Sequence, residues 1–297
     1  MILSIIVCTH NRADLLKNCL VHLLPQLQPN CEIIVVSSAC TDHTPQVLAE
    51  LPHEALRLVA ATKPGLSHAR NVGVAAAQSP NIAFIDDDAY PNPDFVAQSI
   101  YLVQNHNYAC VGGIYQPWYL YGKPNWYKDA WVSSQVHGTE LCAMPAGCYV
   151  SGGVVVYQKK AVLNVGGFDV LLGMNAQKVA YGEETELQNK LVAQGYTVAH
   201  QPKLVVQHLV PKYKLSPSWL LKSAFAKGKN HWRTHHKKPG FILLLKIGVA
   251  MLLHFFGAMA KSVPKLFKKN YYWQNAFIEI LEPFCFGLGR ILGAYLG

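Results

Sequence analysis

Short apolar runs alternate with segments of helical spacing along the first part of the chain. Four runs of strand length are bounded by turn residues: 2–8, 32–37, 56–61 and 81–86. Helical segments lie between them, over residues 13–24, from Thr44-Pro45 onward and over residues 67–77, and another begins near Pro93. Asn11 is expected to cap the first helix. This alternation predicts an α/β fold with a doubly wound, mostly parallel sheet and flanking helices, in which ligands bind beyond the carboxyl ends of the strands.

Three consecutive acids, Asp86, Asp87 and Asp88, follow the apolar residues of the fourth run. Adjacent carboxylates at the tip of a buried strand repel one another unless positive charge lies beside them. A hard divalent cation with oxygen ligands, Mn²⁺ or Mg²⁺, meets that need and commonly bridges carboxylates to substrate phosphates. The triplet therefore indicates a metal site for a phosphate-bearing substrate, and a solvated acidic turn is the alternative.

A pair of acids, Glu183 and Glu184, opens a later segment whose Leu187 and Leu191 have the spacing of an inward helix face. Carboxylates at the start of a helix are stabilised by the positive end of its dipole. A carboxylate can also act as a general base that takes the proton of a hydroxyl attacking a substrate. Acids that only complement the dipole are the alternative.

Charge is distributed unevenly along the chain, whose net charge is +9. Residues 187–278 contain no Asp or Glu but 15 of the 26 Lys and Arg, so a basic tail follows an acidic body. Within this tail, residues 241–260 form an apolar run long enough to cross a bilayer, interrupted by Lys246 and His254. Basic residues on both sides favour a helix lying on a membrane surface. A spanning helix and a buried helix are the alternatives, and the apolar run argues against nucleic acid as a partner.

The composition, 51% hydrophobic and 14% charged, is that of a globular chain. Eight cysteines without a Cys-x-x-Cys pair, and a start that lacks the features of a secretory signal, favour free thiols in a reducing cytosol. The turn after the first run, Cys8 to Arg12, contains no glycine, and no Gly-Lys-Ser/Thr pattern occurs. Dehydrogenase and phosphate-loop ATPase functions are therefore disfavoured.

Five segments follow one another in a characteristic order: IIVCTHNR, EIIVVSSACTDHT, KPGLSHARNVGVAAAQSPNIAFIDDDAYPNPDF, VGGFD and GEETELQNKLVAQGY. Together they resemble the family 2 glycosyltransferases of the GT-A fold, over about residues 1–210. The resemblance implies a nucleotide-sugar-dependent enzyme, typically inverting. It divides the chain into a GT-A catalytic domain over 1–210, and leaves a basic helical linker over 211–240 and an apolar helical membrane-association region over 241–297.

The resemblance also implies roles for the acids. Asp86 and Asp88 fall on the Asp-x-Asp element of the family, which binds the metal and the nucleotide, with Asp88 the more direct metal ligand. Asp87 lies between them and is a candidate nucleotide contact. Glu184 falls on the catalytic base, where most relatives have Asp, so Glu183 remains the alternative. His208 is a candidate metal ligand or phosphate contact, and a structural histidine is its alternative.

The remaining candidates concern the nucleotide. Thr9 and Arg12 fall where the first loop of the family wraps the base, and Arg70 falls where a basic side chain approaches the nucleotide. Ser37 stands where relatives usually have an acid that contacts the base, so UDP, GDP and dTDP sugars stay open. The resemblance also sets Gly152 and Gly153 beside the donor sugar, with an ordinary turn as the alternative.

These observations predict transfer of one sugar from a nucleoside diphosphate to an acceptor hydroxyl at the cytoplasmic face of a membrane. A lipid-linked or growing cell-surface glycan is the expected acceptor, and the missing Gln-x-x-Arg-Trp pattern favours single transfer over polymerisation. A nucleotidyltransferase of similar topology and a non-catalytic nucleotide-sugar-binding module are the alternatives. The sugar, the acceptor and the oligomeric state stay open.

Overall fold

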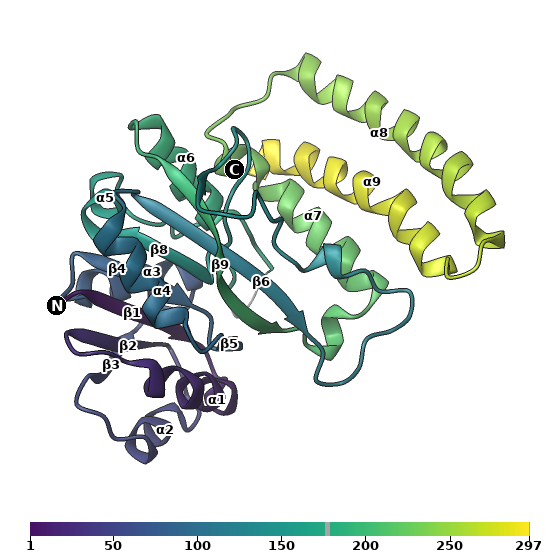
Figure 1. Cartoon of the computed structure of the whole chain (residues 1–297). Coiled ribbons are helices and arrows are strands. Elements are labelled where there is room, and N and C mark those ends of the chain that lie inside the picture. Colours follow the sequence, from purple (N-terminus) through teal and green to yellow (C-terminus); the bar gives the residue numbers. More distant parts are fainter. Residues whose placement is uncertain (176–178, 297) are drawn as a thin grey trace. The chain divides into compact units, whose positions relative to one another are not determined.

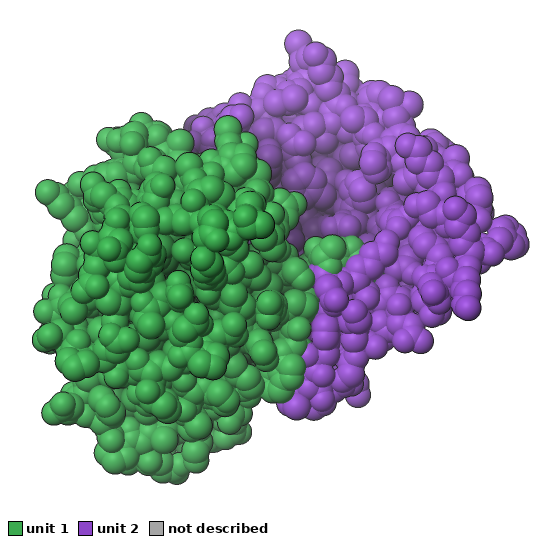
Figure 2. Space-filling view, in the orientation of Figure 1, with its two compact units in different colours: residues 1–118, 130–171, 183–209 green, residues 119–129, 172–182, 210–297 purple. Residues whose placement is uncertain are grey.

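The structure of the chain is a computed structural model that describes residues 1–175 and 179–296. Two units are distinguished, shown in different colours in Figure 2. Unit 1 comprises residues 1–118, 130–171 and 183–209, and unit 2 comprises residues 119–129, 172–182 and 210–297, as far as they are described. Unit 1 contains the sheet, and unit 2 contains three long helices.

The first half of the sheet is parallel, in the order β3-β2-β1-β4. Its strands are β1 (Leu3–Thr9), β2 (Cys31–Ser38), β3 (Leu56–Ala61) and β4 (Asn81–Ile85). The intervening helices are α1 (Ala13–Leu23), α2 (Thr44–Glu50) and α3 (Leu66–Ala76), and a short η1 (Leu24–Gln26) follows α1. The predicted alternation of strands and helices is confirmed here, with bounds that differ by a residue or two.

The second half of the sheet is mixed, and the full order is β3-β2-β1-β4-β8-β6-β9-β5, with β7 beside β9. Its strands are β5 (Ala89–Pro91), β6 (Cys110–Trp118), β7 (Cys142–Ala143), β8 (Val154–Gln158) and β9 (Val198–Leu209). β8 runs antiparallel to β4 and β6, whereas β6 and β9 are parallel. Apolar periodicity carries no information on strand direction, which is why the reversal at β8 could not be predicted from it.

Helices cover both faces of the sheet, as Figure 1 shows. On one face, α1, α2 and α4 (Phe95–Asn105) contribute Leu16, Leu20 and Phe95 to a buried core. On the other, α3, α5 (Lys159–Asn164) and α6 (Glu183–Ala193) contribute to a second core that includes Leu187 and Leu191. Because both faces are buried, the strands are almost uniformly apolar, as the sequence shows.

Unit 2 is built around α7 (Pro217–Thr234), α8 (Phe241–Ser262) and α9 (Trp273–Leu296), with the short helices η3 (Lys212–Lys214) and η4 (Val263–Phe267). α9 packs against both α7 and α8. A side chain at Gly228, Gly289 or Gly293 would overlap the backbone of the facing helix, so these glycines allow α7 and α9 to approach closely. Glu279 on α9 accepts hydrogen bonds from Lys128, Ser262, Lys265 and Tyr271, and these contacts hold α9 to η4 and to the segment 119–129.

The outward face of α8 is apolar and exposed. In the described residues, the stretch Phe241–Phe267 is the one helical segment long and apolar enough to cross a membrane. Its inner side contacts α9 through Met251, beside Gly287, and through Phe255, whose ring lies 6.1 Å from that of Phe284. The large apolar residues exposed on this helix are Phe241, Ile242, Leu243, Leu245, Val249, Leu252, Leu253, Phe256 and Met259.

Candidate active site

The loops after β1, β2 and β4 meet at the carboxyl edge of the parallel strands. Thr9 at the end of β1 is paired with Ser37 on β2, and the acidic triplet follows β4, which is the other neighbour of β1. The first turn differs from expectation at Asn11, whose φ is 51°. Its side chain accepts a hydrogen bond from the Thr41 amide at 2.7 Å instead of capping α1, and Asp42 accepts from the Ala13 amide at 2.9 Å. The cap is supplied by the neighbouring loop because the left-handed backbone of Asn11 directs its side chain away from α1.

Positive groups lie beside the acidic triplet. Arg12 forms ion pairs with the fully buried Asp87 and, at 2.9 Å, with Asp88. Burial raises the pKa of Asp87 to about 7, an effect that Arg12 opposes and the Asp88 charge reinforces. The repulsion expected at the strand tip is therefore offset in part by an arginine from the first loop. The Arg12 side chain is 42% exposed and also reaches solvent.

Asp86, Asp88 and His208 form a group that suits a divalent cation. One potential ligand atom from each lies within 4.8 Å of the others. His208 joins the acids through strand pairing, because Ala89 on β5 lies opposite His208 on β9. Its Nε2 lies 3.2 Å from Asp88 Oδ1. Two carboxylates and an imidazole fit Mn²⁺ better than Mg²⁺, which prefers oxygen ligands.

Arg70 on α3 connects this group to the acidic pair. Its guanidinium lies 3.7 Å from Asp86 Oδ1 and 3.0 Å from Glu183 Oε1, and the residue is 3% exposed. The rings of Phe84 and Phe168 lie 5.6 and 5.4 Å from it, which suits cation–π contacts. Burial alone would lower the pKa of Arg70, but the charges of Glu183 and Asp86 raise it, so Arg70 stays protonated.

The two acids at the start of α6 lie in different surroundings. Glu183 is buried against Arg70, and burial, reinforced by the neighbouring Glu184, raises its pKa to about 8 even though Arg70 opposes the shift. Glu184 is partly exposed, and its buried Oε2 atom has no hydrogen-bond partner among the described residues. Paired hydrogen bonds between Gln188 and the Val150 backbone fix α6 to the preceding segment, and so hold both acids in place.

Tyr115 on β6 also contacts the site, although nothing in the local sequence marks it. Its hydroxyl donates a hydrogen bond to Asp86 Oδ2, and its ring meets the His208 ring edge-on with centroids 4.5 Å apart. A Cβ atom on Gly153 would overlap both the Tyr115 hydroxyl and the Asp86 carboxylate. Only the sheet order, which sets β6 between β8 and β9, could have identified Tyr115.

Comparison with known proteins identifies the family. The profile of the family described as Glycosyl transferase family 2 matches residues 4–162, more than half of the chain. The chain belongs to this family.

Several glycosyltransferases are similar to the chain. Glucosyl-dolichyl phosphate glucuronosyltransferase of Haloferax volcanii is 23% identical over 77% of this chain and 75% of its own length. EpsH of Bacillus subtilis and the succinoglycan biosynthesis protein ExoO of Rhizobium meliloti are 31% and 32% identical, over 33% of this chain in each case. These two matches span only 29% and 28% of EpsH and ExoO.

The fold agrees with solved glycosyltransferases. The mannosyltransferase PcManGT from Pyrobaculum calidifontis, solved in complex with GDP-Man and Mn²⁺, superposes with a TM-score of 0.63 over 95% of this chain and 86% of that one, at 20% identity. The expected GT-A fold is confirmed by this likeness together with the family match.

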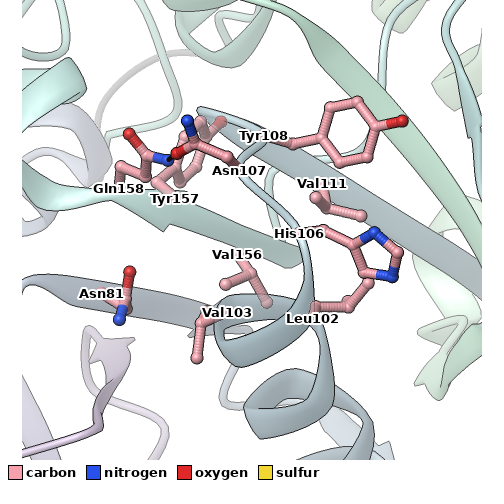
Figure 3. Close-up of a pocket in the computed structure, with 10 residues that line it drawn as sticks. All are labelled: Asn81, Leu102, Val103, His106, Asn107, Tyr108, Val111, Val156, Tyr157 and Gln158. Atoms are coloured by element: carbon pink, nitrogen blue, oxygen red, sulfur yellow. Dashed lines mark hydrogen bonds between the residues drawn. The ribbon is translucent and has the colours of Figure 1, made fainter.

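A cavity of about 170 Å³ lies at the other end of the sheet of this glycosyltransferase (Figure 3). It is lined at the start of β4 by Asn81, at the end of β8 by Gln158 and beyond the end of α4 by His106 and Tyr108. Since β4 runs from Asn81 toward Asp86, the cavity is separated from the acids by the length of the strand. Its lining contains no carboxylate, Lys or Arg, so it is not the candidate active site.

Proposed function

We propose that this chain transfers a single sugar from a nucleoside-diphosphate sugar to an acceptor hydroxyl, with inversion at the sugar carbon. The observation that carries the proposal is the junction at Arg70, which contacts both Asp86 and Glu183. It joins a group of cation ligands to a pair of candidate bases. Sugar transfer needs both, because negative charge develops on the departing diphosphate while the attacking hydroxyl loses its proton.

Asp86, Asp88 and His208 are the residues proposed to hold a divalent cation, Mn²⁺ or Mg²⁺. When bound, the ion supplies positive charge to the diphosphate leaving group. The Mn²⁺ and GDP-Man of the PcManGT complex support this assignment by analogy of fold. Within the chain, Arg12 balances Asp87 and Asp88, and Arg70 balances Asp86, so the carboxylates can remain close together.

Glu184 is the proposed base. Glu183 is less suited to this role. Its pKa is raised to about 8, so it holds its proton at neutral pH, and it is also paired with Arg70. Glu184 is the partly exposed member of the pair, so its carboxylate is the one that an incoming hydroxyl can approach and whose oxygen can accept the proton. Glu183 then serves to orient Arg70 and the start of α6.

Thr9, Arg12 and Ser37 are proposed to contact the nucleotide, because they lie at the carboxyl ends of β1 and β2 or in the loop that follows. Arg12 is the exposed member and can reach solvent. Arg70 and Asp87 are buried, at 3% and 0% exposure, so we propose that they act on the nucleotide through Asp86 and Arg12 and not by direct contact.

A donor screen tests the function. The protein is incubated with UDP-, GDP- and dTDP-sugars and Mn²⁺, and release of the nucleoside diphosphate is measured. For the donor that reacts, Glu184→Gln should lower kcat by about 10²- to 10⁴-fold, the usual contribution of a general base. Donor affinity, measured by calorimetry, should stay within about threefold, since the ligands of the cation are untouched. A Glu184→Gln variant with near-normal kcat would contradict the assigned base.

The acceptor is proposed to be a lipid-linked or growing cell-surface glycan at the cytoplasmic face of a membrane. The dolichyl phosphate in the name of the Haloferax relative and the succinoglycan biosynthesis of ExoO support this proposal. Eight free cysteines agree with a reducing compartment. We propose residues 1–210 as the catalytic domain, 211–240 as a linker and 241–297 as the membrane-association region.

The membrane contact is proposed to be the outward face of α8, lying in the plane of one leaflet. α9 packs against α8 and carries the charged residues Glu279, Glu282 and Arg290, which would be costly inside a bilayer and so support the in-plane placement. Basic residues on both sides of α8, among them Lys238 and Lys268, complement an anionic lipid surface.

A further inference from the structure

The three candidate cation ligands differ in how firmly they are held. Asp88 is paired with Arg12 at 2.9 Å and with His208 at 3.2 Å, and it is 5% exposed. The Asp86 side chain is 28% exposed, and the nearest guanidinium nitrogen, from Arg70, is 3.7 Å away. This distance is too long for a hydrogen bond. In the part of the chain that the structure describes, the hydrogen bond from the Tyr115 hydroxyl is therefore the one that fixes the Asp86 carboxylate.

Tyr115 contacts a second ligand as well. The edge-to-face contact with His208, at 4.5 Å and an interplanar angle of 89°, restricts rotation of the imidazole ring. The two side chains project from neighbouring strands, since β6 and β9 are paired over Ile114–Trp118 and Val205–Leu209. Tyr115 is 8% exposed, so its own position is fixed by the packing of the core. It thus connects two ligands that belong to different segments of the chain.

Gly153 on the approach to β8 explains how this contact is accommodated. Any larger residue there would place its Cβ atom within the space shared by the Tyr115 hydroxyl and the Asp86 carboxylate. The contact therefore depends on three segments, β6, the turn before β8 and the turn after β4, which contribute Tyr115, Gly153 and Asp86 respectively.

We propose that Tyr115 is a positioning residue of the cation site, which holds Asp86 and His208 in the arrangement that a divalent ion requires. The inference rests on the proposed function, since it assumes that these residues bind the ion. Residues that orient metal ligands through hydrogen bonds change metal affinity by about 10- to 100-fold when they are replaced. Tyr115 therefore sets the concentration of cation at which the enzyme works, without contacting the substrate.

Metal binding by the full-length protein tests the proposal without reference to activity. The chelator-treated protein is titrated with Mn²⁺ alone in a calorimeter, and Tyr115→Phe is compared with the unaltered chain. We expect Tyr115→Phe to bind Mn²⁺ about 10- to 100-fold more weakly. Tyr157→Phe is the matched control, because Tyr157 is a buried tyrosine of the same sheet with 1% exposure and is not one of the residues assigned to the site. It should bind Mn²⁺ as the unaltered chain does.

A second variant and a kinetic measurement distinguish a positioning role of Tyr115 from a general effect on folding. Gly153→Ala disturbs the same contact from the β8 side and should also weaken Mn²⁺ binding. Once a donor is known, Tyr115→Phe should raise the Mn²⁺ concentration for half-maximal activity and recover near-normal kcat at saturating Mn²⁺. A general loss of folding would lower kcat at every Mn²⁺ concentration, and that result would overturn the positioning role.

The remaining outcomes separate the inference from the proposed function. If the unaltered chain binds Mn²⁺ and Tyr115→Phe binds it equally well, the role of Tyr115 is refuted while the cation site stands. If the unaltered chain binds no Mn²⁺ even in the presence of a nucleoside diphosphate, the cation site and the role of Tyr115 are both refuted.

Discussion

Replacing Glu183 by Gln tests whether this acid is protonated in the folded protein. Burial and the Glu184 charge raise the pKa of Glu183 from its usual 4.5 to about 8, against the opposing charge of Arg70. Between these two pH values the folded protein holds a proton that the unfolded chain has released. The contribution of the protonated Glu183 to stability is therefore fully present below pH 4.5 and is lost as the pH rises toward 8. Gln keeps the shape of the neutral acid and does not titrate.

The size of the effect follows from the shift. At about 1.4 kcal/mol per pKa unit, a shift from 4.5 to about 8 corresponds to roughly 5 kcal/mol as an upper limit. Because Glu183 shares its environment with Glu184 and Arg70, we expect about half of this limit, roughly 2 to 3 kcal/mol. Because the measured range starts one pH unit above 4.5, about 1.4 kcal/mol of the upper limit lies outside it. The Glu183→Gln variant should therefore gain roughly 1 to 2 kcal/mol of stability relative to the unaltered protein between pH 5.5 and pH 8.5.

Urea unfolding of both proteins at pH 5.5, 7 and 8.5, followed by circular dichroism, measures this difference. Glu140→Gln is the control, because the Glu140 side chain is 72% exposed in its pair with Lys203. The free energy of unfolding of Glu140→Gln should differ from that of the unaltered protein by no more than about 0.5 kcal/mol at every pH. If the attraction of Arg70 outweighed burial, Glu183 would be ionised throughout. Glu183→Gln would then be the less stable protein at all three pH values, by a constant amount, and the argument that leaves Glu184 as the base would fail.

Two further predictions concern the cation and the membrane. His208→Ala should raise the Mn²⁺ concentration for half-maximal activity by at least about tenfold and reduce any preference for Mn²⁺ over Mg²⁺, because the nitrogen ligand is lost. An unchanged preference would favour a structural role for His208. Leu252→Glu, on the outward face of α8, should lower binding to anionic vesicles in a flotation assay by about tenfold or more, since burial of one leucine contributes about 1.5 to 3 kcal/mol. Leu163 on α5 is the matched control, because it is 53% exposed and Leu252 is 54% exposed. Leu163→Glu should float with the vesicles as the unaltered protein does. Equal flotation of both variants would exclude α8 as the membrane contact.

The sequence was sufficient for the parts of the site that depend on local pattern. An acidic triplet after an apolar run predicts carboxylates at a strand tip, and Asp86 and Asp88 lie there. Two acids before the inward leucines of α6 predict carboxylates at the start of a helix, where Glu183 and Glu184 lie. In both cases a few neighbouring residues determine where the side chain projects.

Contacts between distant segments could not be predicted in this way. Tyr115 reaches Asp86 because β6 follows β8 in the sheet, an order that apolar periodicity does not specify. The pairing of Arg12 with Asp87 depends on the turn at Asn11, whose positive φ has no strong signal in the sequence. Both contacts follow from topology and backbone conformation rather than from residue type.

The balance of charge in unit 1 gives an independent reason to expect a cation beside the triplet. Five acids gather around the junction at Arg70, namely Asp86, Asp87, Asp88, Glu183 and Glu184, and two guanidinium groups, those of Arg12 and Arg70, oppose them. Burial is the main cause of the raised pKa values of Asp87 and Glu183, and the charge of a neighbouring acid, Asp88 for Asp87 and Glu184 for Glu183, raises them further. The buried members can relieve the repulsion by binding a proton. The Asp86 side chain is 28% exposed, so a hydrated ion can approach its carboxylate, and each neighbouring acid that stays ionised strengthens the attraction for a divalent ion.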